Sequence, residues 1–177
     1  MEIDSAIAAA LGFPKTKYTA IERERRWLLS EVPRSLIKQT LRVTDVYVDG
    51  TRLRLREMRP LDGAPALLKL TRKADVDART RLITTIYLPE EEYAVLAAVL
   101  SGPRITKIRH RLHTPPGVMM SVDEFQGELS GLVLGEAEFD SDEDLERFPM
   151  PSFAIREVTN EIAYTGGALV KHGVPPA

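Results

Sequence analysis

Apolar and polar residues alternate along much of this chain, which is typical of strands in a sheet with one buried face. The clearest example surrounds the Asp-Gly pair at positions 49–50. This pair predicts a type I′ hairpin with a two-residue turn, in which Tyr47 pairs with Arg52 and Asp45 pairs with Arg54. Side chains two residues apart share a face, so one face of the hairpin would be charged and the other apolar. The charged face would carry Tyr47, Asp45, Arg52, Arg54 and Arg56, and the apolar face would carry Leu53 and Leu55.

Similar alternation predicts the other strands, and helix start and stop signals interrupt it. These signals are Pro89 followed by three glutamates, the Ser-Gly-Pro stop at 101–103, and Thr159 or Asn160 as the cap of a last helix. The predicted strands are residues 19–29, the two arms of the hairpin, 67–73, 79–88, 105–112, 118–125 and 132–139. The other predictions are a short or loose helical segment at 1–18, a loop with a helical turn at 30–38, and helices at 89–100, at 140–147 and from Thr159 or Asn160 to about Val170, with a weak break at 166–167.

About eight strands, mostly antiparallel, with two or three helices indicate an α+β fold. Two arrangements fit this pattern: an open sheet with one charged face in water, or a closed β-barrel with a polar lumen. The charges are sorted, with acids on the first, seventh and eighth strands and bases on the third, fourth and sixth. Solvated faces usually mix the two signs. The sorting therefore favours a closed, eight-stranded antiparallel β-barrel (a tunnel), with helices packed outside it and a C-terminal helix.

Length and composition fit one folded domain. The chain has 177 residues, of which 44% are hydrophobic and 28% charged, so it suits a globular domain rather than a disordered chain. We expect an N-terminal extension at 1–18 and a single domain at 19–177. The net charge of −2 argues against nucleic-acid and anionic-membrane partners. The chain has no cysteine, no apolar run of membrane-spanning length and no basic start typical of a signal peptide, which together predict a cytoplasmic location.

The inward positions of a closed barrel would bring acids and bases together. Carboxylates without cysteine or histidine partners suit Mg²⁺ or Mn²⁺ rather than zinc. Arginine binds phosphate through a planar fork and lysine binds it as a point charge. A metal site beside a basic channel points to a polyphosphate chain, whereas a single charged strand taken alone is more often a solvated face. The candidate acids are Glu22, Glu24, Asp123, Glu136 and Glu138, and the candidate bases are Arg26, Arg52, Arg54, Arg56, Lys69, Lys73, Lys107, Arg109 and Arg111.

The order of these residues along the chain resembles the CYTH superfamily of triphosphate tunnel metalloenzymes. Any one motif is weak, but six in register, within a resemblance that covers about residues 19–170, are specific. The matches are Glu-Arg-Glu-Arg-Arg at 22–26 for the hallmark Glu-x-Glu-x-Lys, the arginines of 52–56, Lys-Leu-Thr-Arg-Lys at 69–73, Lys107 with Arg109, Val-Asp-Glu-Phe-Gln-Gly at 122–127, and Gly131 to Glu138; the segment Arg156 to Thr159 also matches.

The resemblance implies a tunnel that binds a triphosphate with one or two divalent metal ions. The implied metal ligands are Glu22, Glu24, Asp123, Glu136 and Glu138, with Mg²⁺ or Mn²⁺ as the cofactor. The implied phosphate-binding residues are Arg26, Arg52, Arg54, Arg56, Lys69, Lys73, Arg81, Lys107, Arg109 and Arg111. Glu22, Glu24 and Arg26 would carry the catalytic role, in which a metal-positioned water attacks the terminal phosphorus in line.

The resemblance predicts a metal-dependent triphosphatase, and inorganic triphosphate is favoured as the substrate because the tunnel needs no organic group. Alternatives in the same class are a thiamine or nucleoside triphosphatase and a class IV adenylate cyclase. A phosphate or nucleotide sensor without catalysis is an alternative of another class. It is motivated by Arg26 in place of the hallmark lysine, by a fifth strand without acids, and by Ser121 where many members have glutamate. The sequence leaves open whether the chain forms a homodimer.

Overall fold

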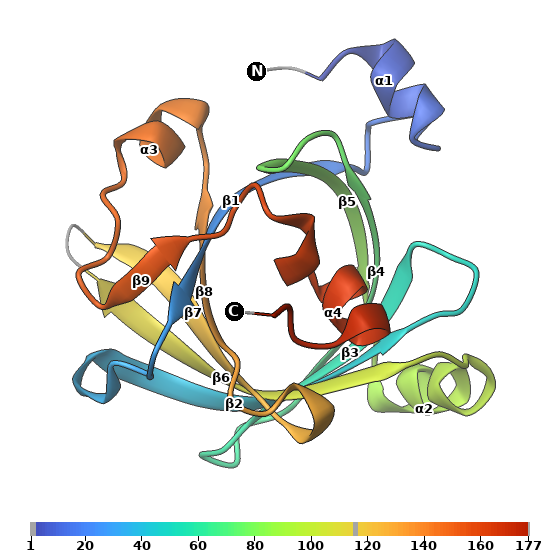
Figure 1. The fold of residues 1–177 in the computed structure, drawn as a ribbon. Helices are drawn as coiled ribbons and strands as arrows, with labels where there is room; N and C mark the ends of the chain where they lie inside the picture. Colours follow the sequence, from blue (N-terminus) through green and yellow to red (C-terminus); the bar gives the residue numbers. More distant parts are fainter. Residues whose placement is uncertain (1–2, 115–116, 177) are drawn as a thin grey trace.

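The computed structural model describes residues 3–114 and 117–176, and its strands form one antiparallel sheet that closes on itself (Figure 1). Around the ring the order is β5-β4-β3-β2-β6-β7-β8-β1, and pairing of β5 with β1 completes it. The ring strands are β1 (Ala20–Leu29), β2 (Ile37–Tyr47), β3 (Leu53–Pro60), β4 (Leu67–Asp75), β5 (Thr80–Tyr87), β6 (Arg104–Thr114), β7 (Val118–Phe125) and β8 (Val133–Phe139). The predicted closed eight-stranded barrel is therefore confirmed.

Four α-helices and one further strand complete the described part of the chain. The strand, β9 (Ala154–Glu157), pairs with the second half of β1 and was not predicted, because four residues are too few to show an alternating pattern. The helices are α1 (Ser5–Ala10), α2 (Glu90–Val99), α3 (Asp142–Arg147) and α4 (Gly166–His172), and short 3₁₀ turns occur at Arg34–Leu36, Gly127–Leu129 and Ile162–Tyr164. None of the described helices has the length and hydrophobicity that crossing a membrane requires.

Apolar side chains on the outer face of the barrel form the largest core. Trp27 of β1 is fully buried there, and its ring lies 5.7 Å from the ring of Phe148, which follows α3. Met120 and Val122 of β7 belong to the same cluster. Because side chains alternate along a strand, burial of this face fixes which residues of β1 and β7 point into the lumen.

The C-terminal residues close one end of the barrel. Ile105, Phe125 and Leu134 point inward from three strands and pack against Tyr164 and Leu169. Figure 1 shows α4 inside the ring of strands. This end of the lumen is therefore apolar, and the charged part lies beyond it.

The hairpin between β2 and β3 has a different register from the predicted one. Tyr47 pairs with Arg54 and Asp45 pairs with Arg56, which is a shift of two residues. A shift of two preserves the face of every side chain, so the predicted charged face survives. Arg52, however, leaves the strand and lies in the connecting loop.

The turn itself explains this shift. A type I′ turn needs a positive φ at both central residues, but Gly50 (φ 69°) is the one residue of this loop that has it. The Thr51 side chain instead stabilises the loop. Its hydroxyl donates to the carbonyl of Val48 (2.9 Å) and accepts from the N–H of Leu53 (2.9 Å). A longer loop held by a threonine side chain therefore replaces the two-residue turn.

The start of the last helix was also predicted wrongly. Thr165, rather than Thr159 or Asn160, caps α4, because its hydroxyl oxygen accepts from the N–H of Ala168 (3.3 Å). Thr159 is buried, and its hydroxyl oxygen accepts from the backbone N–H of Arg26 (3.0 Å). A buried threonine side chain thus ties the segment after β9 to β1, and the helix begins later.

The N-terminal segment packs outside the barrel on β4 and β5. Ala8 and Phe13 form a small cluster with Ala74 and Leu82. The guanidinium of Arg72 lies over the ring of Phe13, with 4.4 Å between its central carbon and the ring centroid. This segment therefore covers the outside of the two strands that carry Lys69, Lys73 and Arg81 on their inner face.

Candidate functional site

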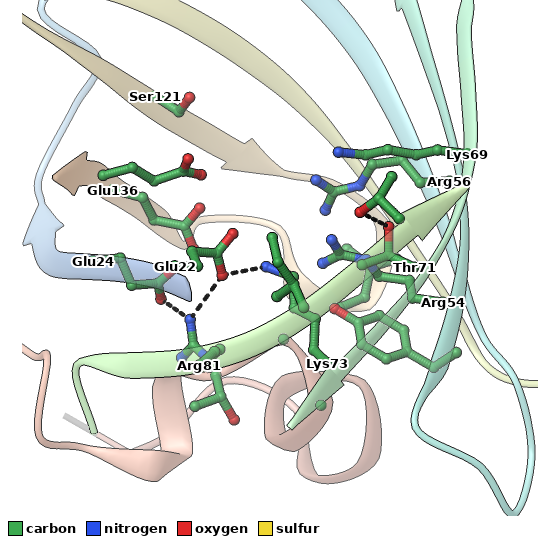
Figure 2. A pocket seen from close by; sticks show the side chains of 18 of the residues that line it. Glu22, Glu24, Arg54, Arg56, Lys69, Thr71, Lys73, Arg81, Ser121 and Glu136 are labelled. Atoms are coloured by element: carbon green, nitrogen blue, oxygen red, sulfur yellow. Dashed lines mark hydrogen bonds and ion pairs between the residues drawn. The ribbon is translucent and has the colours of Figure 1, made fainter. Parts of the chain in front are cut away.

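The lumen holds a cavity of about 970 Å³ that is lined by side chains from all eight ring strands. Carboxylates of β1 and β8 line one wall. Guanidinium and ammonium groups of β3 and β4, across the ring, line the opposite wall (Figure 2). We call these the acidic wall and the basic wall. The separation of charge predicted from the sequence is therefore present inside the barrel.

The acidic wall consists of Glu22 and Glu24 on β1 and Glu136 and Glu138 on β8. Glu24 lies directly across the ladder from Glu138, and like charges in such positions repel. Burial, Glu22 and the other two glutamates raise the pKa of Glu138. Within residues 3–114 and 117–176, no three acidic or histidine side chains are close enough together to form a metal cluster. Four of the five predicted ligands thus share a wall without forming a preassembled cage.

Two cations hold the carboxylates of β1. Lys73 Nζ donates to Glu22 Oε2 at 2.6 Å, and Arg81 pairs with Glu24 and lies 3.7 Å from Glu22 (Figure 2). Arg81 also donates to Asp75 Oδ1 at 2.6 Å. Burial favours the neutral form of Glu22, but the Lys73 ammonium and Arg81 hold the pKa of that carboxyl below its usual range. A divalent cation at this wall would therefore exchange places with Lys73 and Arg81 as partner of the carboxylates.

The basic wall has more positive charge than its neighbours neutralise. Lys69 lies directly across the β3–β4 ladder from Arg56, with Arg54 on the same face. In the part of the chain that the structure describes, no carboxylate forms an ion pair with Lys69. Burial together with Arg56 and Arg54 lowers the pKa of Lys69 to about 8. This wall can therefore accept an anion that carries several charged oxygens.

A second group of bases lies on β6. Arg109 donates to both oxygens of Asp123 at 2.7 Å and to Glu136 at 3.0 Å, and Lys107 Nζ lies 2.5 Å from Asp123. Burial favours the neutral form of Asp123, but Arg109 and Lys107 hold the pKa of its carboxyl below the usual range. Among the residues that the structure describes, Arg111 donates one hydrogen bond, to Gln39 at 3.4 Å. Asp123 therefore lies behind the lining of the cavity as a counter-ion of Arg109 and Lys107. Most N–H donors of Arg111 remain available to a ligand in the lumen.

Two predicted bases lie away from the centre of the cavity. Arg26 is buried behind the acidic wall, where Nε lies 3.3 Å from Glu24 Oε1 and Nη2 donates to the carbonyl of Thr159 (2.9 Å). Arg52 is exposed at the rim and donates to the carbonyl of Leu11 (3.1 Å). The cavity lining thus includes every predicted acid and base except Arg26 and Asp123, which lie behind it.

Sequence reasoning assigned no role to Asp45 or Thr71, and it interpreted Tyr47 as a packing residue. Asp45 is fully buried behind the basic wall, and the Thr71 hydroxyl lies in the wall itself, 3.1 Å from the Thr85 hydroxyl. Tyr47 lies at the apolar end, where a Cβ atom at Gly166 would be 2.0 Å from its hydroxyl oxygen. The alternation of β2 and β4 already places all three side chains on the inner face, so this pattern could have identified them.

Comparison with known proteins gives a partial sequence match and several structural ones. No protein-family model matches the chain. An inorganic triphosphatase of Nitrosomonas europaea is 32% identical over 84 residues, which cover 48% of this chain and 56% of that protein. The match therefore spans about half the length of each.

Crystal structures extend the likeness to most of the chain. Two structures of the protein NE1496 superpose on this chain, each with a TM-score of 0.55 and each covering 88% of it. The first, described as a hypothetical protein, is 26% identical and is covered to 99% of its length. The second, described as an inorganic triphosphatase, is 25% identical and is covered to 97%. The PH1819 protein of Pyrococcus horikoshii shares the fold alone, with a TM-score of 0.52, 19% identity and coverage of 71% and 82%. The closed barrel, its charged lumen and these relatives together confirm the resemblance of this chain to the CYTH superfamily of triphosphate tunnel proteins.

Proposed function

We propose that this chain hydrolyses inorganic triphosphate to phosphate and pyrophosphate with the help of Mg²⁺ or Mn²⁺. The observation that carries the proposal is the sorted lumen, in which an acidic wall faces a basic wall across one cavity. A metal ion is positively charged and a polyphosphate chain is negatively charged, so binding both in one cavity requires an acidic surface and a basic surface. The inorganic triphosphatase among the relatives supports the same substrate.

The acidic wall suits a hard divalent cation by its chemistry. Its donors are carboxylate oxygens, which Mg²⁺ and Mn²⁺ prefer. Glu24 and Glu138 lie directly across the ladder from each other, and burial together with the neighbouring carboxylates raises the pKa of Glu138. We propose that Glu22, Glu24, Glu136 and Glu138 would hold the ion. When bound, it would neutralise phosphate charge and favour the attack of a water molecule on phosphorus.

The protein's own residues would bind and orient the substrate. Arg54, Arg56 and Lys69 would hold phosphate oxygens from β3 and β4, and Arg109 and Arg111 would hold them from β6, beyond β2 in the ring. In the reaction, a water oxygen bonds to the terminal phosphorus while the bond from that phosphorus to the bridging oxygen breaks and pyrophosphate leaves. Fixed positive groups stabilise the charge that develops on the bridging oxygen. We place Asp123 behind them as the counter-ion of Arg109 and Lys107, since Arg109 occupies both of its oxygens.

The direct test is phosphate release from tripolyphosphate, measured with Mg²⁺, with Mn²⁺ and in excess EDTA. We expect turnover with the metals and its loss in EDTA. A parallel series with thiamine triphosphate, ATP and GTP, in which cyclic AMP is also measured, would identify the preferred substrate. Absence of phosphate release from all of them, with either metal, would contradict the proposal.

A sensor that binds triphosphate without hydrolysing it is the second candidate. It is favoured by one observation: Lys73 and Arg81 occupy the carboxylates that a metal would need. Such a protein would show a higher melting temperature with tripolyphosphate and no turnover, because a ligand that binds only the folded state stabilises it. Turnover that disappears when the acidic wall is altered would exclude this candidate.

Triphosphate binding near pH 8 should be accompanied by proton uptake at Lys69. The pKa of this lysine is lowered to about 8 by burial, by Arg56, Arg54 and Lys73, and only partly offset by Glu138. A bound polyanion favours the charged form and raises that pKa, so affinity should fall as the pH rises above 8. Calorimetric titration with tripolyphosphate in buffers of different ionisation enthalpy measures the uptake. The Lys69→Arg variant should bind without it, and equal uptake by both proteins would contradict the assignment.

A further inference from the structure

Asp45 is a buried carboxylate that holds part of the basic wall in place. Its side chain is fully buried on β2, directly across the ladder from Arg56. Arg56 Nε donates to Asp45 Oδ1 at 2.5 Å and Arg56 Nη2 donates to Oδ2 at 2.7 Å. Two parallel hydrogen bonds of this kind fix the plane of a guanidinium as well as its position.

The contact leaves donors of two arginines unused. Arg56 Nη1 makes no hydrogen bond to any residue that the structure describes. Arg54 Nε is buried and 3.6 Å from Asp45 Oδ1, and it likewise has no hydrogen-bond partner in residues 3–114 and 117–176. A buried donor without a partner costs free energy. Both arginines line the cavity beside Lys69, so an anion in the lumen would meet their guanidinium groups (Figure 2).

Stability alone does not account for an ion pair at this position. Replacing a buried ion pair with well-packed apolar residues is often neutral or stabilising. The same hairpin shows that apolar pairs fit here, because two residues further along, Val43 pairs with Met58 in a buried apolar cluster. The barrel could therefore close without Asp45. What the carboxylate adds is a fixed orientation of Arg56 and a counter-charge between two like-charged guanidinium groups.

We propose that Asp45 is a positioning residue that orients Arg56, and through their shared charge Arg54, toward the phosphate chain. The inference rests on the proposed function, since it assumes that the lumen binds a triphosphate. Asp45 itself touches no ligand in this arrangement. It acts through Arg56, so its loss should affect the rate of reaction more than the strength of binding.

The test compares Asp45→Asn with Glu57→Gln. Glu57 is the matched control because it lies next to Arg56 on the outer face of β3 and pairs there with Arg59. We expect Asp45→Asn to lower kcat on tripolyphosphate by about tenfold to a hundredfold, because small misplacements of a binding group have effects of that size. KM, and the Kd for tripolyphosphate in EDTA, should not rise, since the arginine charges remain and one anion is removed. Glu57→Gln should leave kcat, KM and Kd unchanged.

A second comparison separates positioning from folding. Assays are run well below the melting temperature of each variant, and Arg56→Lys is combined with Asp45→Asn. If Asp45 acts through Arg56, the double variant should be little slower than Arg56→Lys alone. A kcat within about twofold of the parent for folded Asp45→Asn, or losses that multiply in the double variant, would overturn the proposal.

One measurement does not depend on turnover. In the parent protein, the nuclear magnetic resonance signal of the Arg56 Nε–H should shift when tripolyphosphate is added, and in Asp45→Asn it should be lost to rapid exchange. A parent protein that binds tripolyphosphate and shows this shift but no hydrolysis would contradict the proposed function and support the role of Asp45. Absence of a shift on binding would overturn that role even in an active enzyme.

Discussion

Replacing Glu22 and Glu24 together with glutamine is expected to lower metal-dependent phosphate release from tripolyphosphate by about a thousandfold or more. Both side chains lie on the acidic wall, and the change removes two negative charges there with little change in volume. Lys73 and Arg81 would lose their main partners in the same step. Binding of tripolyphosphate in EDTA should therefore become tighter while turnover disappears, and calorimetry beside the phosphate assay would measure both.

The control for this variant changes two exposed acids of α2, Glu90→Gln with Glu91→Gln, which carry the same charge outside the barrel. The control should keep full activity. Undiminished turnover in the Glu22 and Glu24 variant would remove the acidic wall from the mechanism. Equal losses in both variants would indicate that net charge, rather than this site, sets the rate.

Arg56→Met is expected to lower the free energy of unfolding by about 3–5 kcal/mol at neutral pH, since breaking a buried ion pair leaves an uncompensated charge. The charge left behind is Asp45, which is fully buried and whose remaining ion-pair partner in the described part of the chain is the more distant Arg54. Chemical denaturation of the parent and the variant measures the difference. Arg59→Met, which removes an exposed arginine from the outer face of the same strand, should change the free energy of unfolding by less than about 0.5 kcal/mol.

The size of that loss should depend on pH. Burial favours the neutral form of Asp45, but Arg56 and then Arg54 hold the pKa of its carboxyl well below the ordinary value of 3.8. A carboxyl whose pKa is lowered by folding stabilises the protein above that ordinary value and loses the contribution as the pH falls below it. The parent should therefore lose more stability than Arg56→Met between neutral pH and the acid range. Plotted against pH, the free energies of unfolding of the two proteins should approach each other as the pH falls. Parallel curves would contradict this account of the pair.

The alternation of side chains allowed the barrel and its inner face to be predicted, because a strand with one buried face can place its charges only on the other. Lys69, Arg81 and Glu136 line the lumen for this reason alone. The error in the hairpin register did not change which residues were predicted to line the lumen, because a shift of two residues keeps each side chain on its face. The alternation of apolar and polar residues therefore predicted which face each side chain occupies. It did not predict the turn at Gly50, because that turn depends on hydrogen bonds of the Thr51 side chain.

Contacts between distant segments could not be predicted in this way. Thr159 looked like a helix cap, yet its hydroxyl satisfies a backbone N–H of β1, and only the closed fold brings the two together. The family resemblance placed Asp123 among the implied metal ligands. Its two oxygens are occupied by Arg109, an arrangement that follows from pairing of β6 with β7 rather than from either strand alone.

The junction of β1 with β5 has a consequence for the motions of the barrel. Four residue pairs, Ala20 to Arg23 with Thr80 to Ile83, form this ladder, which is the shortest of those described around the ring. Local opening is easiest where the fewest backbone hydrogen bonds must break. The same ladder joins Glu22 to Arg81 and so carries part of the charged lumen. A metal ion held by Glu22 together with a phosphate held by Arg81 would join the two strands and slow amide exchange along this seam, so occupancy of the tunnel would appear as rigidity of its wall.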